Sequence, residues 1–458
     1  MSDDEEIVNT SLLSGISNLG NTCYMNAVLQ VFNATDILSS YFISKKFNEH
    51  LKGNILAKIC QKQEKDHEES GKEGDIEYMV SKEQIRRKKK NSLTYQYYKV
   101  INKMWSENCI VKPVSFKKKI NKKMKLFCGN RQEDSAEFIT FLLDRFHEDL
   151  KLDCKIIDIS LLIPDVVIFK NEYDLKENII NETDDEDKKE LLKNELFEFI
   201  KKNYNFYTII KYFDFWRMYL KNNYSPIIDI FTFTYLTKIE CNTCENISCQ
   251  FEPENILKIS IPKQEESVDI HELIENEFKV IEKLEGCDKY YCDICKCKQD
   301  AKKTINICNF PDRLIIQIKR FDYKLIQIGN SFHQNISKIN TKINFDLDNL
   351  DLKQLEEIKN QNESIYELYG IIIHMGSPSG GHYTAYCKNM LNNKWYYFDD
   401  DDVYHVSEDE ILSSNPYIFL YKKKYKNDLL EDDDEEEDED SEDSEDSEDS
   451  EEEDDEEY

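Results

Sequence analysis

One cysteine in this sequence, Cys23, stands where a polar loop passes into a predicted helix. Apolar residues recur after it at helical spacing: Tyr24, Val28, Val31 and Phe32. Asn21 or Thr22 can cap this helix, because a short side-chain oxygen accepts a free N–H of the first turn. The positive end of the helix dipole then favours the thiolate of Cys23, which is the nucleophilic form. The pattern makes Cys23 a candidate nucleophile.

Asn18 and Gly20, in the loop that precedes Cys23, also fit nucleophilic catalysis. Asn18 can donate its side-chain amide N–H to an oxyanion that forms beside Cys23. Gly20 lets the loop approach closely. A buried structural cysteine at a helix start would show the same local pattern. A catalytic role therefore requires a histidine and an orienting carboxylate or amide elsewhere in the chain.

His382 is the histidine that best fits this requirement among the eight in the chain. It follows Gly380 and Gly381, which let backbone approach and leave one side of the imidazole unobstructed. It also opens a predicted strand over 382–388. The alternative is an ordinary strand histidine with satisfied hydrogen bonds.

An aspartate is expected beside His382 from the pairing of two strands. A hairpin with its loop at 389–392 places His382 opposite Asp399, where Cβ atoms lie roughly 4.5–5.5 Å apart. A carboxylate there can accept the imidazole N–H and stabilise the imidazolium. A slip of one residue would favour Asp400 instead. Without this pairing, the four consecutive aspartates from Asp399 would be a solvated turn.

Two Cys-x-x-Cys pairs predict a metal site. The pairs are Cys241 with Cys244 and Cys292 with Cys295. Four thiolates make a closed tetrahedral zinc site, which is structural rather than catalytic. The 47 residues between the pairs exceed the spacing of a compact ribbon, so the site would join two distant hairpins. Cys249 and Cys297 lie close enough in sequence to substitute as ligands.

Composition limits the class of protein. The chain has 458 residues, 40% of them hydrophobic, and a net charge of −32. Residues 431–458 hold 23 acids and no Lys or Arg, which leaves −9 for the rest. This mild charge argues against a nucleic-acid ligand, which needs a basic face. We expect no signal peptide and no membrane span, because the most apolar run, 156–169, is interrupted by Asp and Pro. We expect the cytosol or nucleus, where thiols stay reduced.

The elements that must position these residues indicate an α+β fold class. One helix is expected from Cys23 to about Phe47 and an amphipathic helix over 131–150. Strands are expected over 230–237 and then at 256–261, 304–308, 313–321, 366–374, 382–388, 394–399 and 416–422. Polar segments near 62–92, 151–222 and 333–362 are expected to be insertions. The first insertion ends in a basic run, 86–90, which is an import signal or a solvated face.

The residues that follow 424 form an acidic tail, 425–458. Charge of one sign at this density cannot collapse, so we expect the tail to be disordered. It could bind basic proteins as partners, or it could only add solubility.

The chain as a whole resembles the ubiquitin-specific protease family, papain-like cysteine peptidases that remove ubiquitin. The segment 15–30 resembles the family's cysteine box, and 380–386 with 395–400 resembles its histidine box. Gln132-Glu133-Asp134 with Glu137-Phe138 resembles its glutamine–aspartate helix, although Ala136 stands where the family usually has histidine. Segments 288–292 and 316–321 resemble its zinc-bearing and core strands. The resemblance covers 14–424, preceded by a lead-in, 1–13.

The resemblance implies a thumb, palm and fingers architecture. Helices that include Cys23 form the thumb, a sheet with His382 forms the palm, and zinc-tipped strands form fingers that hold ubiquitin. It implies Cys23 as nucleophile, His382 as base, Asp399 as its orienter and Asn18 as oxyanion donor, with Asp400 assisting. Three residues match positions that line the channel for the ubiquitin tail: Asp134, Phe321 and Tyr383. The implied partners are ubiquitin and ubiquitinated proteins, and the implied cofactor is structural Zn²⁺, with none in catalysis.

Three other functions stay open on the sequence. The chain could bind ubiquitin without effective catalysis, although all four active-site residues are present. It could act on another ubiquitin-like modifier. It could be an acidic, chaperone-like interaction protein that works through its tail.

Overall fold

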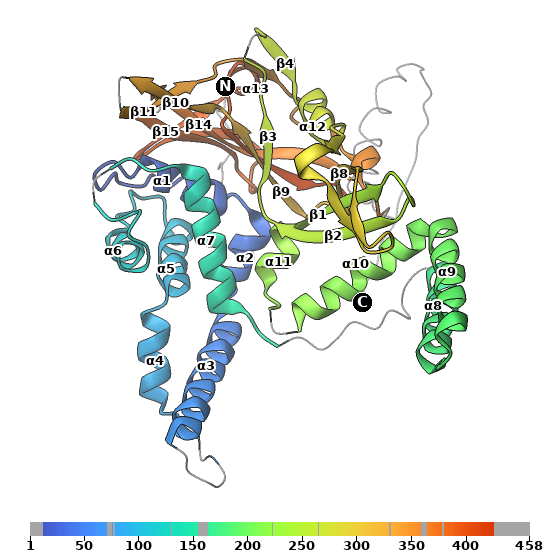
Figure 1. The fold of residues 1–458 in the computed structure, drawn as a ribbon. Helices are drawn as coiled ribbons and strands as arrows, with labels where there is room; N and C mark the ends of the chain where they lie inside the picture. The colour runs from blue at the N-terminus through green and yellow to red at the C-terminus, as the bar shows by residue number, and fades with distance from the viewer. Residues whose placement is uncertain are drawn as a thin grey trace, which may run out of the picture.

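A computed structural model shows a helical lobe packed against a large sheet, with a smaller sheet beside them (Figure 1). It describes residues 12–70, 76, 78–129, 131–153, 164–221, 223–263, 265–328, 331–358, 364–377 and 380–425. The expected lead-in therefore lies almost wholly outside the described residues. The acidic run 431–458 lies entirely outside them.

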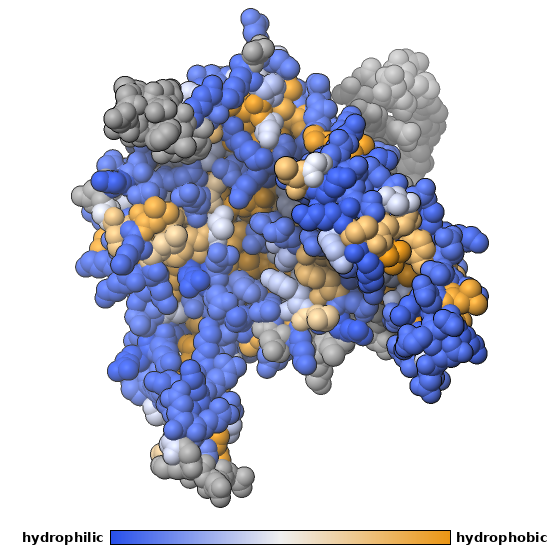
Figure 2. All heavy atoms as spheres, in the orientation of Figure 1, coloured by the Kyte–Doolittle hydropathy of each residue, from blue (hydrophilic) through white to orange (hydrophobic). Residues whose placement is uncertain are grey.

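The helical lobe, or thumb, contains the first seven helices. They are α1 (Cys23–Asn33), α2 (Asp36–Ile43), α3 (Phe47–Ser70), α4 (Lys82–Lys90), α5 (Leu93–Ser106), α6 (Val114–Lys123) and α7 (Ser135–Leu150). The expected insertion near 62–92 corresponds to the end of α3 together with α4, which extend away from the sheets (Figure 1). Figure 2 shows that hydrophilic residues cover this arm.

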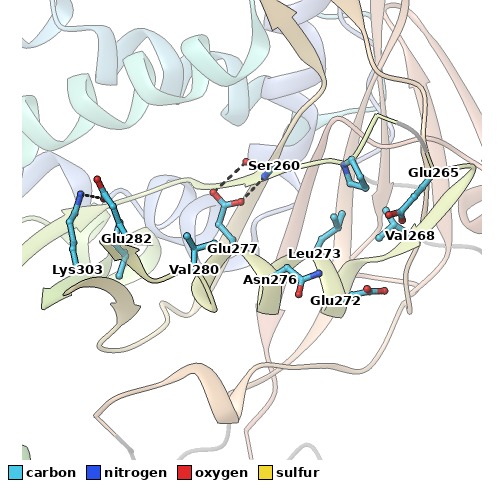
Figure 3. Close-up of a pocket in the computed structure, with 12 residues that line it drawn as sticks. Ser260, Glu265, Val268, Glu272, Leu273, Asn276, Glu277, Val280, Glu282 and Lys303 are labelled. Atoms are coloured by element: carbon cyan, nitrogen blue, oxygen red, sulfur yellow. Dashed lines mark hydrogen bonds and ion pairs between the residues drawn. The ribbon is translucent and has the colours of Figure 1, made fainter. Parts of the chain in front are cut away.

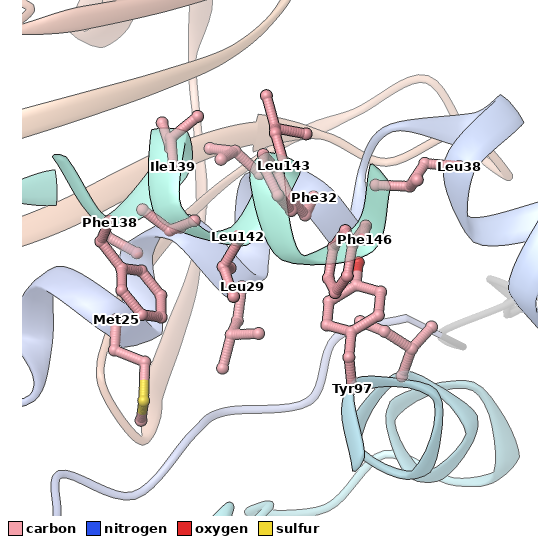
Figure 4. Close-up of a cluster of buried hydrophobic side chains, with 14 of the residues drawn as sticks. Met25, Leu29, Phe32, Leu38, Tyr97, Phe138, Ile139, Leu142, Leu143 and Phe146 are labelled. Carbon is pink, nitrogen blue, oxygen red and sulfur yellow. The ribbon is translucent and has the colours of Figure 1, made fainter. Parts of the chain in front are cut away.

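The core of the thumb is built around α1, all of whose residues are buried. Its inner face meets the apolar stripe of α7, and Leu38 from α2 and Tyr97 from α5 close the same cluster (Figure 4). The rings of Tyr97 and Phe146, for example, lie 4.7 Å apart. The cluster continues into the large sheet through Ile372 and Ala385. The helix that carries Cys23 is therefore held between the thumb and the large sheet.

The expected single helix from Cys23 to Phe47 is wrong, because the chain breaks twice. Side chains capture the carbonyl groups that a longer helix would use: Thr35 Oγ1 donates to Val31 O at 2.9 Å, and Ser39 Oγ donates to Asn33 O at 2.8 Å. Such local bonds compete with helix continuation. The second break lies between Ile43 and Phe47 and contains Lys45, whose φ is 63°.

The large sheet, or palm, has eight strands. The strand order is β17-β16-β15-β14-β18-β9-β3, and β13 pairs with β14 at one end. The bounds are β3 (Leu257–Ser260), β9 (Arg313–Lys319), β13 (Leu350–Asp351), β14 (Ile365–Ser377), β15 (Gly380–Lys388), β16 (Trp395–Asp399), β17 (Asp402–Val406) and β18 (Ile418–Lys423). Apart from the two short edge strands β13 and β17, each overlaps an expected strand.

The smaller sheet, or fingers, has the order β2-β1-β8-β5 and stands next to a two-stranded unit, β6-β7. The bounds are β1 (Phe233–Cys241), β2 (Ile247–Glu254), β5 (Glu282–Leu284), β6 (Tyr290–Cys292), β7 (Cys297–Gln299) and β8 (Ala301–Ile307). The strand expected over 230–237 is partly wrong. Pro226 opens a short helix, α11 (Pro226–Phe231), because proline is suited to a first helical turn.

The remaining elements lie outside these layers. Helices α8 (Pro164–Glu182), α9 (Glu186–Lys202) and α10 (Tyr204–Leu220) occupy the expected insertion near 151–222, and α10 packs on β2. Helices α12 (Ile270–Phe278) and α13 (Glu408–Leu412) flank the palm. Two short 3-10 turns, η2 (Gly286–Asp288) and η3 (Lys353–Leu355), and the strands β4 (Ser267–Asp269), β10 (Phe321–Ile328), β11 (Ser331–Lys338) and β12 (Lys342–Asn344) complete the described chain. No helix within these ranges is both long and apolar enough to cross a membrane.

Candidate active site

Cys23 is the first residue of α1 and is 3% exposed. Thr22 occupies the capping position, but the expected cap does not form, because its hydroxyl accepts the N–H of Leu19 at 2.8 Å instead. Asn21 has a φ of 50° and lies before the cap. The loop is thus braced by its own side chains, and the N–H groups of the first helical turn remain available around the sulfur.

The thiol of Cys23 is less acidic than its place at a helix start predicts. Burial raises its pKa, and the negative charge of Asp400 raises it further. Hydrogen bonds from the backbone N–H groups of Tyr383 and Tyr24 act in the opposite direction without cancelling the effect. The expectation that the helix dipole favours the thiolate is therefore opposed by burial, and ionisation needs a base.

His382 and Asp399 form the expected pair. The imidazole Nε2 of His382 lies 2.5 Å from Asp399 Oδ1, and both side chains are about one-third exposed. The bond to Asp399 leaves Nδ1 as the ring nitrogen available to Cys23. The N–H of Tyr383, the next residue after His382, reaches the sulfur. The sulfur and the histidine strand therefore meet, as the catalytic hypothesis requires.

The strand register that brings His382 and Asp399 together differs from the expected one. Lys388 pairs with Trp395 rather than Asn393, because the loop runs over 389–394 and turns at Asn393, whose φ is 52°. Extending this register places His382 opposite position 401, two residues beyond Asp399. A shift of two keeps both side chains on the same face, so they meet as diagonal neighbours.

The aspartates that follow β16 form a tight turn with a separate role. Asp399 pairs with Asp402, and Asp400 adopts a φ of 53°, which aspartate tolerates in turns. The carboxylate of Asp400 accepts N–H bonds from Asn18 Nδ2 at 2.8 Å and from Asn26 Nδ2 at 2.7 Å. Its carbonyl accepts the N–H of Ile16 at 2.7 Å. This turn therefore clamps the loop that precedes Cys23.

The same clamp explains why residue 15 must be small. A Cβ placed on Gly15 would lie 2.2 Å from the carbonyl oxygen of Asp401. Any larger side chain would push the turn away from the cysteine loop.

The amide of Asn18 is already engaged in this arrangement. Its Nδ2 donates to Asp400, and its Oδ1 accepts the N–H groups of Gly20 at 2.9 Å and Thr22 at 3.2 Å. Its assignment as an oxyanion donor stays a prediction, and it requires the bond to Asp400 to be exchanged or shared when the substrate arrives.

We expect the Asp400→Asn variant to separate acidity from activity. Removing the negative charge lowers the pKa of Cys23, so iodoacetamide should alkylate Cys23 faster at neutral pH than in the unmodified chain. Turnover should nevertheless fall by about 10-fold or more, because Asn18 and Asn26 lose a charged acceptor worth about 1.5–3 kcal/mol each. Asp401→Asn, which changes an exposed neighbour, is the control. An unchanged alkylation rate in Asp400→Asn would contradict the electrostatic part of this account.

Gln132 completes the site, and sequence reasoning did not assign it a role. Its Nε2 donates to Cys23 Sγ at 3.5 Å, while its Oε1 accepts the N–H of Gly381 at 2.7 Å. One side chain from the thumb therefore touches both the sulfur and the strand that carries His382. Its position two residues before the helix cap Asp134 was the available signal.

The three residues expected to line a substrate channel lie together around Tyr417. The Tyr417 hydroxyl donates to Asp134 Oδ2 at 2.6 Å, and its ring packs on those of Phe321 and Tyr383 at 5.5 and 6.3 Å. Asp134 is also the N-cap of α7, which explains why the helix begins at Ser135 rather than at 131. Burial lowers the pKa of the adjacent His374 to about 4, so its ring is neutral at pH 7 and acts as a further wall.

The four cysteines of the two Cys-x-x-Cys pairs converge at the tip of the fingers. Their sulfur atoms all lie within 4.8 Å of one another, with Cys241···Cys295 at 4.0 Å and Cys244···Cys292 at 3.5 Å. Each pair is followed by a residue with positive φ, Glu245 at 59° and Lys296 at 55°. The two turns thus have matching shapes, and together they offer four thiols to one metal ion.

A separate pocket of about 530 Å³ lies between β3, α12 and β8 (Figure 3). Its polar groups largely satisfy one another: Glu277 accepts the N–H of Ser260 at 3.0 Å, and Lys303 pairs with Glu282 at 2.9 Å. Its lining contains neither cysteine nor histidine. The catalytic constellation lies elsewhere, at the junction of thumb and palm.

Comparison with known protein families agrees with this geometry. The family model described as ubiquitin carboxyl-terminal hydrolase matches residues 14–421. The chain belongs to this family. The ubiquitin carboxyl-terminal hydrolase match includes both the cysteine loop and the histidine strand, so the residues described above lie within the family domain.

Curated relatives show the same relationship along most of the chain. Human "Ubiquitin carboxyl-terminal hydrolase 2" is 26% identical over 416 residues, which cover 90% of this chain and 55% of that protein. "Ubiquitin carboxyl-terminal hydrolase 4" of Saccharomyces cerevisiae (strain ATCC 204508 / S288c) is 28% identical over 429 residues, which cover 90% and 39%. The chain thus spans about half or less of the length of these relatives.

Solved structures share the fold. The SAGA DUB module that contains Ubp8, bound to monoubiquitin, gives a TM-score of 0.57 at 18% identity and covers 90% of this chain and 70% of that one. The same module bound to ubiquitin aldehyde gives 0.55 at 19% identity and covers 90% and 70%.

Proposed function

We propose that this chain is a cysteine deubiquitinase that cleaves the bond after the C-terminal glycine of ubiquitin. The observation that carries the proposal is the meeting of Cys23, Gln132 and the His382–Asp399 pair at one junction of thumb and palm. Acyl transfer through a thioester needs a nucleophile, a base and a carboxylate that orients the base, and here the sulfur adjoins the strand that carries the base. Family membership supports ubiquitin as the acyl donor.

In the proposed reaction, His382 takes the thiol proton as Cys23 attacks the glycine carbonyl carbon. The protonated imidazole is stabilised by Asp399 and then gives its proton to the departing lysine amine as the carbon–nitrogen bond breaks. Water, deprotonated by His382, adds to the thioester, and the carbon–sulfur bond breaks. Ubiquitin leaves with a free carboxylate, and Cys23 regains its proton.

Negative charge develops on the carbonyl oxygen in both tetrahedral intermediates. Donors near the sulfur are the first-turn N–H groups of α1 and Gln132 Nε2, and Asn18 can join them if its amide leaves Asp400. We assign Gln132 two roles: it donates toward the reacting centre and it fixes Gly381, which precedes the base.

Gln132→Ala should lower kcat by about 10- to 100-fold with little change in KM, because the lost donor acts mainly on the transition state. Steady-state hydrolysis of ubiquitin–rhodamine measures both constants. Arg131→Ala, an exposed neighbour on the same loop, should leave them unchanged. A rise in KM with kcat preserved would show instead that Gln132 only binds substrate.

The group around Tyr417 supports a specificity role for Asp134, Phe321 and Tyr383. Three aromatic rings and a carboxylate would form a narrow wall beside the nucleophile. A slot of this kind admits a tail of two glycines and excludes residues with side chains. Such a slot would give selectivity for ubiquitin without reading the attached protein.

We also propose that the four finger cysteines hold one structural Zn²⁺. A tetrahedral ZnS₄ site with Zn–S bonds of about 2.3 Å has sulfurs about 3.8 Å apart, and the two distances above bracket this value. When bound, the ion would join the two Cys-x-x-Cys turns and would take no part in catalysis. Cys241 and Cys292 are fully buried, which suits a closed site.

The proposed location of the protein is the cytosol or nucleus. The two Cys-x-x-Cys pairs favour metal binding over disulfides, which is the use of cysteine expected in a reducing compartment.

The test of the proposed function is hydrolysis of linkage-defined diubiquitins and of ubiquitin–rhodamine by the full chain. We expect free ubiquitin as the product. Matched substrates built on other ubiquitin-like modifiers should be cleaved at least about 100-fold more slowly. Binding of ubiquitin without any cleavage would support a non-catalytic binding module and would refute the proposal.

A further inference from the structure

Exposed cations are concentrated on two helices of the thumb, α4 and α6, and the proposed catalysis does not use them. Exposed cations on α4 are Lys82, Arg86, Arg87, Lys88 and Lys90. Those on α6 and just after it are Lys118, Lys122, Lys123 and Lys125. We call these nine residues the basic surface. Within 81–93 and 112–125 the single acidic residue is Glu83, which pairs with Arg86 at 2.8 Å.

The two helices present these cations on neighbouring parts of the thumb. Helix α5 contacts both α4 and α6, and the ammonium of Lys119 in α6 donates to Asn91, the C-cap residue of α4. The lysines of α6 are crowded: the pKa of Lys119 is lowered first by burial and then by the charges of Lys122 and Lys123. Like charges at this density repel, and a bound polyanion would relieve that repulsion.

A polyanion of matching size belongs to the same chain. The acidic tail, 431–458, carries 23 acids and no cation, and it lies outside the described residues. The 33 residues after Tyr425 can extend about 110 Å at most. A domain of about 410 residues has a radius of gyration of about 22 Å, so the tail can reach any of its faces.

We propose that the acidic tail 431–458 docks on the basic surface of its own chain. Charge complementarity favours the contact. The covalent link to the domain favours the tail over an acidic partner that is free in solution. A tethered segment acts at an effective concentration in the millimolar range, so another acidic protein or a nucleic acid must displace it before binding. The contact is electrostatic and weakens as salt shortens the Debye length.

The first test is zero-length carbodiimide cross-linking of the full chain, which joins carboxylates to lysine amines that touch them. Mass spectrometry should find tail residues joined to Lys118, Lys122 and Lys123, and these products should disappear at about 0.5 M NaCl. Products with Lys422–Lys426 are set aside, because these lysines adjoin the tail in sequence. Links mainly to Lys188 and Lys193 of α9 would overturn the proposal.

The second test uses charge reversal with a matched control. A labelled peptide of sequence 431–458 should bind a chain ending at residue 430, which keeps every described residue. K118E/K122E/K123E should weaken this binding at least about 10-fold, and K188E/K193E/K202E on α9 should change it less than about twofold. If the α6 variant does not fold by thermal unfolding, R86E/R87E replaces it. Equal losses in the basic-surface and control variants would refute the docking site.

The full chain supplies the decisive comparison. Its own tail should make the full chain bind the labelled peptide at least about 10-fold more weakly than the truncated chain does. Equal binding by the two chains would show that the tail does not occupy the surface. If the full and truncated chains bound an RNA strand of about 20 nucleotides equally well, the surface would be assigned to nucleic acid, and this result would likewise contradict the proposal. None of these readouts depends on deubiquitinase activity.

Discussion

We expect the Cys23→Ser variant to release rhodamine from ubiquitin at least about 10⁴-fold more slowly than the unmodified chain. A serine hydroxyl at this place is far less acidic than a thiol, and the sulfur is the atom that Gln132 and the N–H of Tyr383 surround. The measurement is initial rate under substrate saturation.

Two controls separate loss of chemistry from loss of structure. Cys60→Ser changes a half-buried cysteine on α3 and should keep full activity. The Cys23→Ser variant itself should bind free ubiquitin with an affinity within a few-fold of the unmodified chain, because replacing the sulfur leaves the proposed slot and fingers intact. Residual turnover within about 10-fold of normal would place the nucleophile elsewhere.

The second large effect is expected at the finger tip. Cys292→Ser should abolish stoichiometric zinc, lower the unfolding temperature and raise KM for ubiquitin–rhodamine by about 10-fold or more. Structural zinc sites contribute about 10–16 kcal/mol of binding free energy in isolated peptides, and one missing thiolate forfeits much of it. The fingers are expected to hold the body of ubiquitin, so their disorder weakens binding more than chemistry.

Cys297→Ser is the matched control for this experiment. It changes an exposed cysteine in β7, which belongs to the same two-stranded unit as Cys292. The sulfur of Cys297 accepts a hydrogen bond from Gln299 Nε2 and lies outside the four-sulfur cluster. This variant should retain one zinc per chain and an unchanged KM. Alkylation of Cys23 by iodoacetamide should be equal in both variants, since the active site lies at the thumb and palm. A Cys292→Ser chain that keeps its zinc would contradict the proposed ligand set.

The sequence predicted best what is encoded locally. The Cys-x-x-Cys turns are short and self-contained, and all four thiols meet as expected. The amphipathic stripe of α7 has a clear helical period, and its boundary was wrong only because Asp134 serves as the cap. The pairing of His382 with Asp399 was predicted from a hairpin register that was off by two, and the pair forms because a shift of two residues keeps a side chain on the same face.

Features set by distant contacts could not be predicted. The break after α1 depends on Thr35, whose hydroxyl also meets Tyr369 from the palm at 3.0 Å. The acidity of Cys23 depends on burial and on Asp400, which is 377 positions away in the chain. Gln132 gains its role only when thumb and palm meet. Each of these requires the assembled core, whereas helical period and turn chemistry do not.

The clamp at Asp400 shows what the four consecutive aspartates do. A solvated turn was one reading of them, and the structure does place a tight turn there. Its first residue, Asp399, orients His382, and the next, Asp400, secures the loop before Cys23 through Asn18 and Asn26. One short turn thus connects the base to the nucleophile.

The most direct measurement is covalent capture of the full chain by ubiquitin carrying a C-terminal vinyl sulfone, followed by peptide mapping. We predict one adduct per chain, a thioether on Cys23, formed much more slowly when His382 is replaced by alanine. An adduct on an exposed cysteine such as Cys128, or no adduct in a sample shown to be folded, would contradict the assignment of Cys23 as the nucleophile that attacks ubiquitin.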